Sequence, residues 1–186
     1  MVGLVDGVFR HGTAISPNEV LRAVDRGVLV LGSSSMGALR AAECAPFGMV
    51  GVGRVYEAYA SGEVDADDEV AMTYDRESLR PMSEAMINLR FGIAAAVSAG
   101  VVDAGLADRF LAVAKGLHYP QRSLAAVLAR LAREVDAGSC AAVRRFFVEL
   151  APNVRRDDAR QLLMEVRRAV AREQEPERSS VRGPDG

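Results

Sequence analysis

The segment GSSSMGALRAAE (residues 32–43) places three serines between an apolar run and a helical pattern. The first amide N–H groups of a helix have no partner within it and carry partial positive charge, so such a turn can bind an anion or stabilise an oxyanion. A serine on a sharp strand-to-helix turn can also be a nucleophile, although Ser33 stands where the nucleophile elbow has its first glycine. Gly37 would let a substrate or another chain approach the backbone closely. These residues indicate a nucleophile or an anion site at Ser35.

The same residues also fit structural roles. Ser34 or Ser35 could simply be the N-cap of the helix that follows. Arg40 and Glu43, three residues apart on that helix, could form an ordinary ion pair. Alternatively, Arg40 could turn back toward Ser35 and hold an anionic group. The sequence leaves both pairs of alternatives open.

Carboxylate and amide side chains elsewhere could add acid–base or binding groups. Asp6 ends an apolar run near the N-terminus. The acidic stretch at residues 63–69 is typical of a solvated loop, although Asp68 and the glutamate after it could reach inward as acid–base groups. Glu84 and Asn88, one helical turn apart, could face the same point or could be merely exposed.

Several kinds of site are excluded by the residues present. There are two histidines, His11 and His118, and no HExxH motif, which argues against a zinc hydrolase. No P-loop motif occurs, and residues 48–53 lack the third glycine of a dinucleotide fingerprint, so they are expected to form a tight loop. Cys44 and Cys140 are too few for a disulfide framework and lack metal-ligand spacing. We therefore expect no metal and no cofactor.

Two short apolar runs should position the serine turn. Residues 3–6 and 28–31 have the continuous hydrophobicity of strands that are buried on both faces. Between them, Ser16, Pro17 and Glu19 have the spacing of a capping box at the start of a helix. Such a β-α-β unit has parallel strands and a right-handed crossover. Because ligands gather beyond the carboxyl ends of parallel strands, the aspartate that ends the first run and the three serines should share one edge.

The rest of the chain is predicted to be mostly helical. One more strand is expected at residues 70–74, and helices are expected at residues 36–45, 54–60, 81–99, 106–116, 123–137, 141–150 and 157–171. The fold class is therefore α/β, with a small parallel sheet and flanking helices in the N-terminal half and a helical C-terminal half. We expect an α/β core at residues 1–100, a helical part packed on the core at 101–172, and a disordered tail at 173–186.

Composition limits the setting in which the protein works. The chain has 186 residues, of which 49% are hydrophobic and 26% charged, as in a soluble globular protein. It has no apolar run of membrane length and no signal-peptide pattern, so we expect a cytoplasmic protein without membrane contact. A net charge of −2 gives no general attraction to nucleic acid. Arginines of the C-terminal helices form a locally basic face that could be solvated or could dock an acidic partner.

Seven blocks resemble the TfuA-like core family in order and spacing. They are GLVDGVF (3–9), SPNEVLRAVDRGVLVLGSSSMGALRAAE (16–43), FGMVGVGRVYEAY (47–59), DDEVA (67–71), PMSEAMINLR (81–90), YPQRSLAAVLARL (119–131) and RRDDARQLL (155–163). SMGALRAAE is the specific signature among them, and the resemblance runs from about residue 1 to 170. The family often has His-Lys-Glu where this chain has Pro17, Asn18 and Glu19, so that histidine has no role here.

The resemblance implies work beside a YcaO-type enzyme, which uses ATP to activate a peptide amide oxygen. TfuA-like proteins accompany YcaO enzymes when sulfur replaces that oxygen, a post-translational modification that gives a backbone thioamide in ribosomal natural products (RiPP biosynthesis) or in a modified enzyme. The implied role is to supply or release sulfur, or to activate the YcaO enzyme. The implied partners are the YcaO-type enzyme, its precursor peptide and a thiocarboxylated sulfur-carrier protein.

In that setting, the residues suggest a hydrolase that acts on a thiocarboxylate or thioester. Ser35 would be the nucleophile, the amides of Met36 and Gly37 the oxyanion site, and Asp6 or Asp68 the proton acceptor. The hypothesis assigns catalytic roles to Ser35, Asp6, Arg40, Glu43 and Asp68, and substrate binding to Ser34, Met36, Gly37, Glu84 and Asn88.

Two rival hypotheses remain. One is a non-catalytic adaptor or activator that docks the YcaO enzyme to its peptide or sulfur donor, with surface arginines such as Arg155 and Arg156 in the interface. The other is an independent small-molecule esterase, which is disfavoured because no histidine is clearly placed for a triad.

Overall fold

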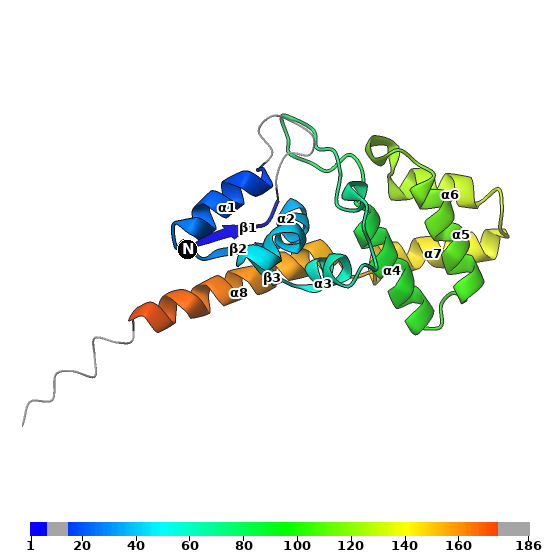
Figure 1. The fold of residues 1–186 in the computed structure, drawn as a ribbon. Coiled ribbons are helices and arrows are strands. Elements are labelled where there is room, and N and C mark those ends of the chain that lie inside the picture. Colours follow the sequence, from blue (N-terminus) through cyan, green and yellow to red (C-terminus); the bar gives the residue numbers. More distant parts are fainter. Residues whose placement is uncertain (7–14, 175–186) are drawn as a thin grey trace, which may run out of the picture.

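A three-stranded parallel sheet lies at the centre of the N-terminal half. The computed structural model describes residues 1–6 and 15–174. The strands β1 (Val2–Leu4), β2 (Val30–Ser33) and β3 (Val50–Val52) lie in the order β1-β2-β3 (Figure 1). The predicted parallel pair is confirmed, but the loop predicted at residues 48–53 is wrong, because β3 forms there. A pattern of two valines around one glycine is too short to predict a strand.

Helices α1 (Pro17–Asp25) and α2 (Met36–Cys44) pack together on one face of the sheet. Right-handed crossovers between strands in the order β1-β2-β3 must place both connecting helices on the same face. Their shared core includes Val20, Ala41 and Met49, together with Val30 of β2. The predicted capping box of α1 is confirmed, since Ser16 and Glu19 bond each other's backbone amides.

The opposite face of the sheet is covered by the C-terminal helix α8 (Val154–Gln174), which runs along the strands (Figure 1). Leu162, which is 1% exposed, packs between Leu31 of β2 and Val52 of β3. The chain therefore returns to the sheet after its helical half, and α8 supplies the layer that the two crossovers leave open. Within residues 1–6 and 15–174, no helix is long and apolar enough to cross a membrane.

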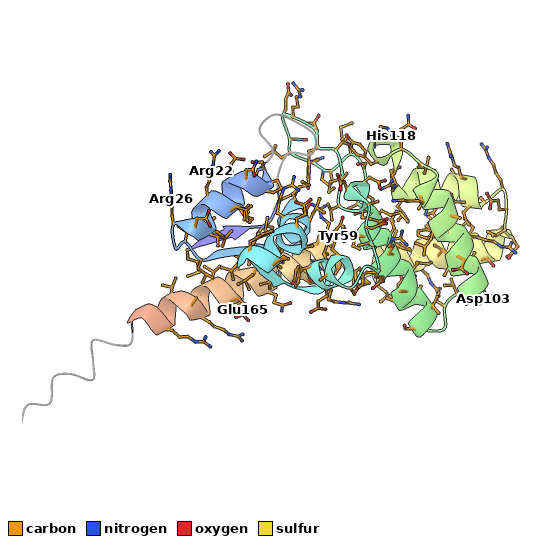
Figure 2. The ribbon with its side chains drawn as sticks, in the orientation of Figure 1. Arg22, Arg26, Tyr59, Asp103, His118 and Glu165 are labelled. Carbon is orange, nitrogen blue, oxygen red and sulfur yellow. The ribbon has the colours of Figure 1, made fainter. Side chains whose placement is uncertain are left out.

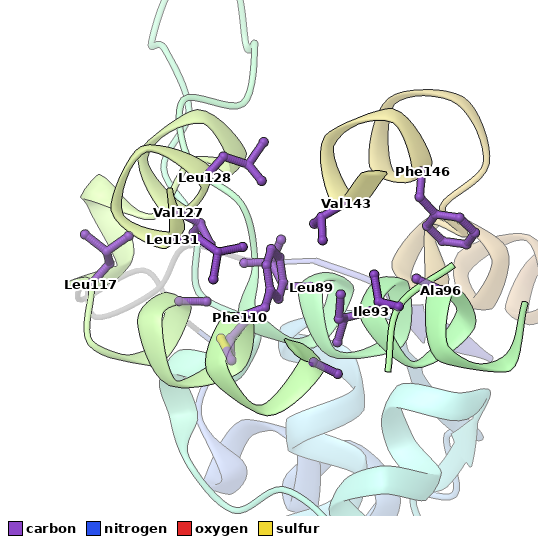
Figure 3. Close-up of a cluster of buried hydrophobic side chains, with 14 residues drawn as sticks. Leu89, Ile93, Ala96, Phe110, Leu117, Val127, Leu128, Leu131, Val143 and Phe146 are labelled. Carbon is purple, nitrogen blue, oxygen red and sulfur yellow. The ribbon is translucent and has the colours of Figure 1, made fainter. Parts of the chain in front are cut away.

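Two more helices belong to the N-terminal half: η1 (Ala45–Phe47) follows α2, and α3 (Arg54–Ala60) packs against α2 and β3. The remaining helices are η2 (Asp67–Glu69), α4 (Met86–Ser98), α5 (Ala104–Lys115), η3 (Tyr119–Gln121), α6 (Leu124–Leu131) and α7 (Ala137–Glu149). Helices α4 to α7 enclose a core around the fully buried Phe110 (Figure 3). Phe110 stacks on Phe147, with ring centroids 5.0 Å apart. The predicted fold class, a small parallel sheet with flanking helices followed by a helical half, is confirmed.

Two further local predictions are wrong. The expected strand at residues 70–74 does not form, because Val70 packs with Met36 and Leu39 of α2 rather than joining the sheet. The helix expected from Pro81 begins five residues later, at Met86, because Pro81 forms an isolated antiparallel bridge with Tyr74. The segment between residues 72 and 85 is therefore an irregular connection, and Tyr74 near its start contacts Asp6, which follows β1.

Candidate functional site

The serine turn lies at the carboxyl end of β2. Ser34 is 4% exposed and has a φ of 73°, a left-handed conformation that is uncommon for a residue other than glycine. Ser35 is 1% exposed and occupies the N-cap position of α2, but its side chain makes no capping hydrogen bond. Its hydroxyl instead lies 3.5 Å from the carbonyl oxygen of Val70. The first turn of α2 is therefore left without a side-chain cap.

Glycines let α2 sit directly on the strand ends. A Cβ on Gly37 would lie 2.0 Å from the carbonyl oxygen of Leu4, and a Cβ on Gly32 would lie 2.1 Å from the carbonyl oxygen of Gly37. The close approach expected at Gly37 is thus made by the chain's own β1. The carbonyl of Val5 accepts hydrogen bonds from the amides of Ser35 at 3.2 Å and Gly37 at 3.4 Å. This contact fixes the end of β1 beside the serine turn.

Asp6, directly after Val5, contacts a buried arginine of α8. The carboxylate of Asp6 accepts hydrogen bonds from Arg155 at 3.0 Å and from the hydroxyl of Tyr74 at 3.1 Å. Burial raises the pKa of Tyr74, so its hydroxyl stays protonated and can donate to Asp6. Arg155 is only 8% exposed, so the surface position expected for it is wrong, whereas the neighbouring Arg156 is exposed.

Glu84 and Asn88 meet at the same edge. The side-chain amide of Asn88 donates to Glu84 at 2.8 Å, and its carbonyl oxygen accepts from the backbone amide of Arg155 at 3.3 Å. These contacts join the start of α4 to the start of α8. The sequence singled out both residues, and the structure places them beside Arg155.

Arg40 and Glu43 form the ordinary ion pair that was one of the two predicted alternatives. Their side chains are 2.7 Å apart, and Arg40 also donates to the carbonyl oxygen of Ile15 at 2.7 Å. One hydrogen bond joins the guanidinium to Ile15, just before α1, and the other joins it to Glu43 of its own helix. Arg40 therefore ties α2 to the start of α1.

Asp68 and Glu69 reach inward but pair with cations of the helical half. Glu69, which is 2% exposed, accepts two hydrogen bonds from Arg90 and one from Lys115, while Asp68 binds Lys115 and the fully buried Arg122. Burial opposes ionisation of both carboxyls, but these cations outweigh it and lower both pKa values. This network links η2 to α4, α5 and the segment before α6.

Asp158 and Arg155 are the polar residues that the sequence interpretation missed as site residues. The carboxylate of Asp158 accepts hydrogen bonds from the amides of Arg54 at 3.0 Å and Val55 at 2.8 Å, and so caps α3 from α8. Burial raises the pKa of Asp158 despite these bonds. A signal was present for Asp158, because it lies four residues from Val154 and four from Leu162 on α8, and both of those residues are buried.

The two histidines give no catalytic partner in the described part of the chain. His118 packs edge-on against Tyr119, and Figure 2 places it in the helical half. His11 lies outside the described residues. The hydroxyl of Ser35 has its one hydrogen bond, within residues 1–6 and 15–174, with a backbone carbonyl.

The model of the TfuA-like protein family matches residues 6–123. The chain belongs to the TfuA-like family. A comparison with curated proteins finds no significant match. The matched segment of this TfuA-like protein contains Asp6, the serine turn and Asn88, while Arg155 lies beyond it. Membership associates the chain with YcaO-type partners in thioamidation.

Proposed function

We propose that this TfuA-like protein is an accessory protein for YcaO-dependent backbone thioamidation of a ribosomally made peptide, and that it releases the sulfide for that reaction. The observation that carries the proposal is the family match over residues 6–123. The arrangement of Ser35 and Asp6 at the carboxyl edge of the sheet supports a hydrolytic route to sulfide. The sulfur donor would be a carrier protein with a C-terminal thiocarboxylate.

The reaction would be hydrolysis of R–COS⁻ by water to R–COO⁻, HS⁻ and a proton. In the first step, the Ser35 oxygen bonds to the acyl carbon, the carbon–sulfur bond breaks, and sulfur leaves with the hydroxyl proton as HS⁻. In the second step, water attacks the acyl–serine ester, which restores the hydroxyl and releases the carboxylate and a proton. No oxidant or reductant is needed.

The uncapped start of α2 suits the oxyanion of both steps. The Met36 amide makes no hydrogen bond within the described residues, and the Gly37 amide has only a long one, 3.4 Å, to Val5. A tetrahedral oxygen could therefore accept from both amides in the positive field of the helix N-terminus. In this proposal, Ser34 lines the turn.

Asp6 would receive the proton of Ser35 through a water molecule and pass it on to the departing sulfur. Asp68 is less suited to this role, because its carboxylate already binds Lys115 and Arg122. The side chain of Asp6 is 40% exposed, so water can reach it. Glu84 and Asn88 would then shape the side of the site formed by α4.

Sulfide release from a thiocarboxylated carrier tests this proposal. Ser35→Ala should lower the release rate at least about 100-fold, because the nucleophile is lost. Ser33→Ala is the matched control: Ser33 lies two residues away and is fully buried, but its hydroxyl bonds the carbonyl of Asp158. That variant should keep the rate while losing some stability. Undiminished release by folded Ser35→Ala would sink the proposal.

A second candidate is a non-catalytic adaptor that docks YcaO to its peptide or sulfur donor. It is favoured by the burial of Ser35 and by its contact with a carbonyl rather than with a side-chain base. Arg156 and Arg160, whose side chains are 60% and 67% exposed on α8, would lie in the interface. Arg156→Glu with Arg160→Glu should then weaken association with YcaO, while Ser35→Ala would leave thioamidation intact at saturating protein.

A further inference from the structure

The guanidinium of Arg155 is buried, yet its hydrogen bonding is incomplete. Its Nε–H is inaccessible to solvent and has no partner within the described residues. One terminal nitrogen points at the thioether sulfur of Met72, which is a weak acceptor. The other binds a single carboxylate oxygen of Asp6 at 3.0 Å. One face of a permanently charged group is thus left without an oxygen acceptor.

Arg122 shows how the same fold satisfies a buried arginine that has a structural role. It is fully buried, and its nitrogens donate to the carbonyl oxygens of Ala114, Asp68 and Leu117 and to the Asp68 carboxylate. Buried polar groups are normally paired in this way, and an exception calls for an explanation such as a ligand. Arg155 is that exception.

Arg155 also lies beside the serine turn. Met72 is two residues from Val70, whose carbonyl oxygen faces the Ser35 hydroxyl. Asp6 follows Val5, whose carbonyl accepts from the amides of the same turn. Both neighbours of the guanidinium therefore belong to the segments that hold Ser35. The positive end of α2 and the charge of Arg155 consequently act on the same edge of the sheet.

The contacts of Arg155 can be exchanged for those of a ligand. Asp6 would keep a donor, because the hydroxyl of Tyr74 already binds the same carboxylate oxygen at 3.1 Å. Met72 has a flexible side chain that can move off the guanidinium. The side chain of Asp6 is 40% exposed, and Tyr74 as a whole residue is 42% exposed. Solvent therefore reaches the Asp6–Arg155 ion pair from the side of Asp6 and Tyr74.

We infer that Arg155 binds the terminal carboxylate or thiocarboxylate of an acyl substrate, taking it in a bidentate grip through Nε–H and one terminal N–H. Two N–H groups of the planar guanidinium can donate in parallel to the two acceptor atoms of such an anion, whereas the Asp6 oxygen accepts from one terminal nitrogen only. This inference rests on the proposed function for the identity of the anion. It adds that Arg155 is the residue that recognises the free carboxylate-type end of that substrate.

Binding of two matched peptides tests the inference without any chemistry. The probes are an acetylated tripeptide of alanine with a free C-terminal carboxylate and the same peptide as a C-terminal carboxamide, titrated by NMR. The wild-type protein should bind the carboxylate form about tenfold more tightly, since only that form can accept two charge-assisted hydrogen bonds from the Arg155 guanidinium. Arg155→Gln should abolish this preference. Arg156→Gln, at the exposed neighbouring position, should retain it.

A second variant gives an effect in the opposite direction. Asp6→Asn removes the competing carboxylate from Arg155, so it should tighten binding of the carboxylate peptide by about threefold or more. A purely structural ion pair would give no such gain, and this variant serves if Arg155→Gln does not fold. Equal binding of the two peptides to wild-type protein, or a preference that survives in folded Arg155→Gln, would overturn the inference.

The outcome is separable from that of the proposed function. Neither peptide contains sulfur, so their binding reports recognition alone. A carboxylate preference that depends on Arg155, in a protein that releases no sulfide from a thiocarboxylated carrier, would keep the inference and reject the hydrolase. Sulfide release by Arg155→Gln at the wild-type KM would reject the inference and keep the hydrolase.

Discussion

Asp158 holds the turn between β3 and α3 with two short hydrogen bonds from backbone amides. The same carboxylate explains Gly53, where a Cβ would lie 2.4 Å from the Asp158 carboxyl carbon and where φ is +93°. A residue of α8 thus substitutes for the missing N-cap side chain of α3. The contact fixes the end of β3 against the C-terminal helix.

Asp158→Ala should destabilise the protein by about 2 kcal/mol, because the part-buried amide of Arg54 and the buried amide of Val55 lose their acceptor. Asp158→Asn should cost less, since it keeps one acceptor oxygen and removes a charge whose burial raises the pKa of the group. Urea unfolding measures both variants, with Asp157→Ala, at an exposed neighbouring position, as the control. An Ala variant as stable as wild type would contradict the capping role.

The sequence was informative about single residues where a local pattern specifies position. The apolar runs placed Asp6 and the serines at one edge, and the structure has them there. Arg155 could not be distinguished in the same way, because Arg156 and Arg160 are of the same type on the same helix. Arg155 is fixed by hydrogen bonds with Asn88 of α4 and with Asp6, which follows β1, and no local pattern reports these long-range contacts.

At the scale of elements, the Asp68–Glu69 network joins η2 to α4 and α5. Glu69→Gln should destabilise the protein by about 2 kcal/mol near pH 7, less than for a wholly buried pair because Arg90 and Lys115 are partly exposed. The folded-state pKa of Glu69 is lowered, so its stabilisation is present above the unfolded pKa and lost as pH falls through the folded value.

Thermal unfolding between about pH 7 and pH 3 tests this dependence. The melting temperature of wild type should fall on acidification below about pH 5, and the fall should be shallower in Glu69→Gln. Asp65→Asn, at an exposed position of the same acidic stretch, should follow wild type. Identical pH profiles for wild type and Glu69→Gln would show that the network does not contribute.

Elements were predictable where capping and periodicity agree, as in α1. The C-terminal helix was also predicted, but its position on the sheet was not. Amphipathicity shows that one face of a helix is buried, and it does not show which surface that face packs against. Handedness could have supplied part of the answer. Three strands joined by right-handed crossovers leave one face bare, and a later helix has to cover it.

At the scale of the whole molecule, the fold class and the family both followed from the sequence. The family match, however, ends at residue 123, before α6, α7 and α8. The edge with Ser35 is completed by Asp6 from the start of the chain, Met72 and Tyr74 from the middle, and Arg155 from α8. The proposed site therefore needs the intact chain through α8.

Thioamidation by purified YcaO enzyme, with a thiocarboxylated carrier as the sole sulfur source, tests the central claim most directly. The reaction is run with and without this protein and followed by the mass of the precursor peptide. We predict thioamide product when this protein is present and none when it is absent. Excess free sulfide should allow the YcaO enzyme to form product without this protein. Product formed at the same rate without this protein, or a requirement that persists in excess sulfide, would contradict a role in sulfide release.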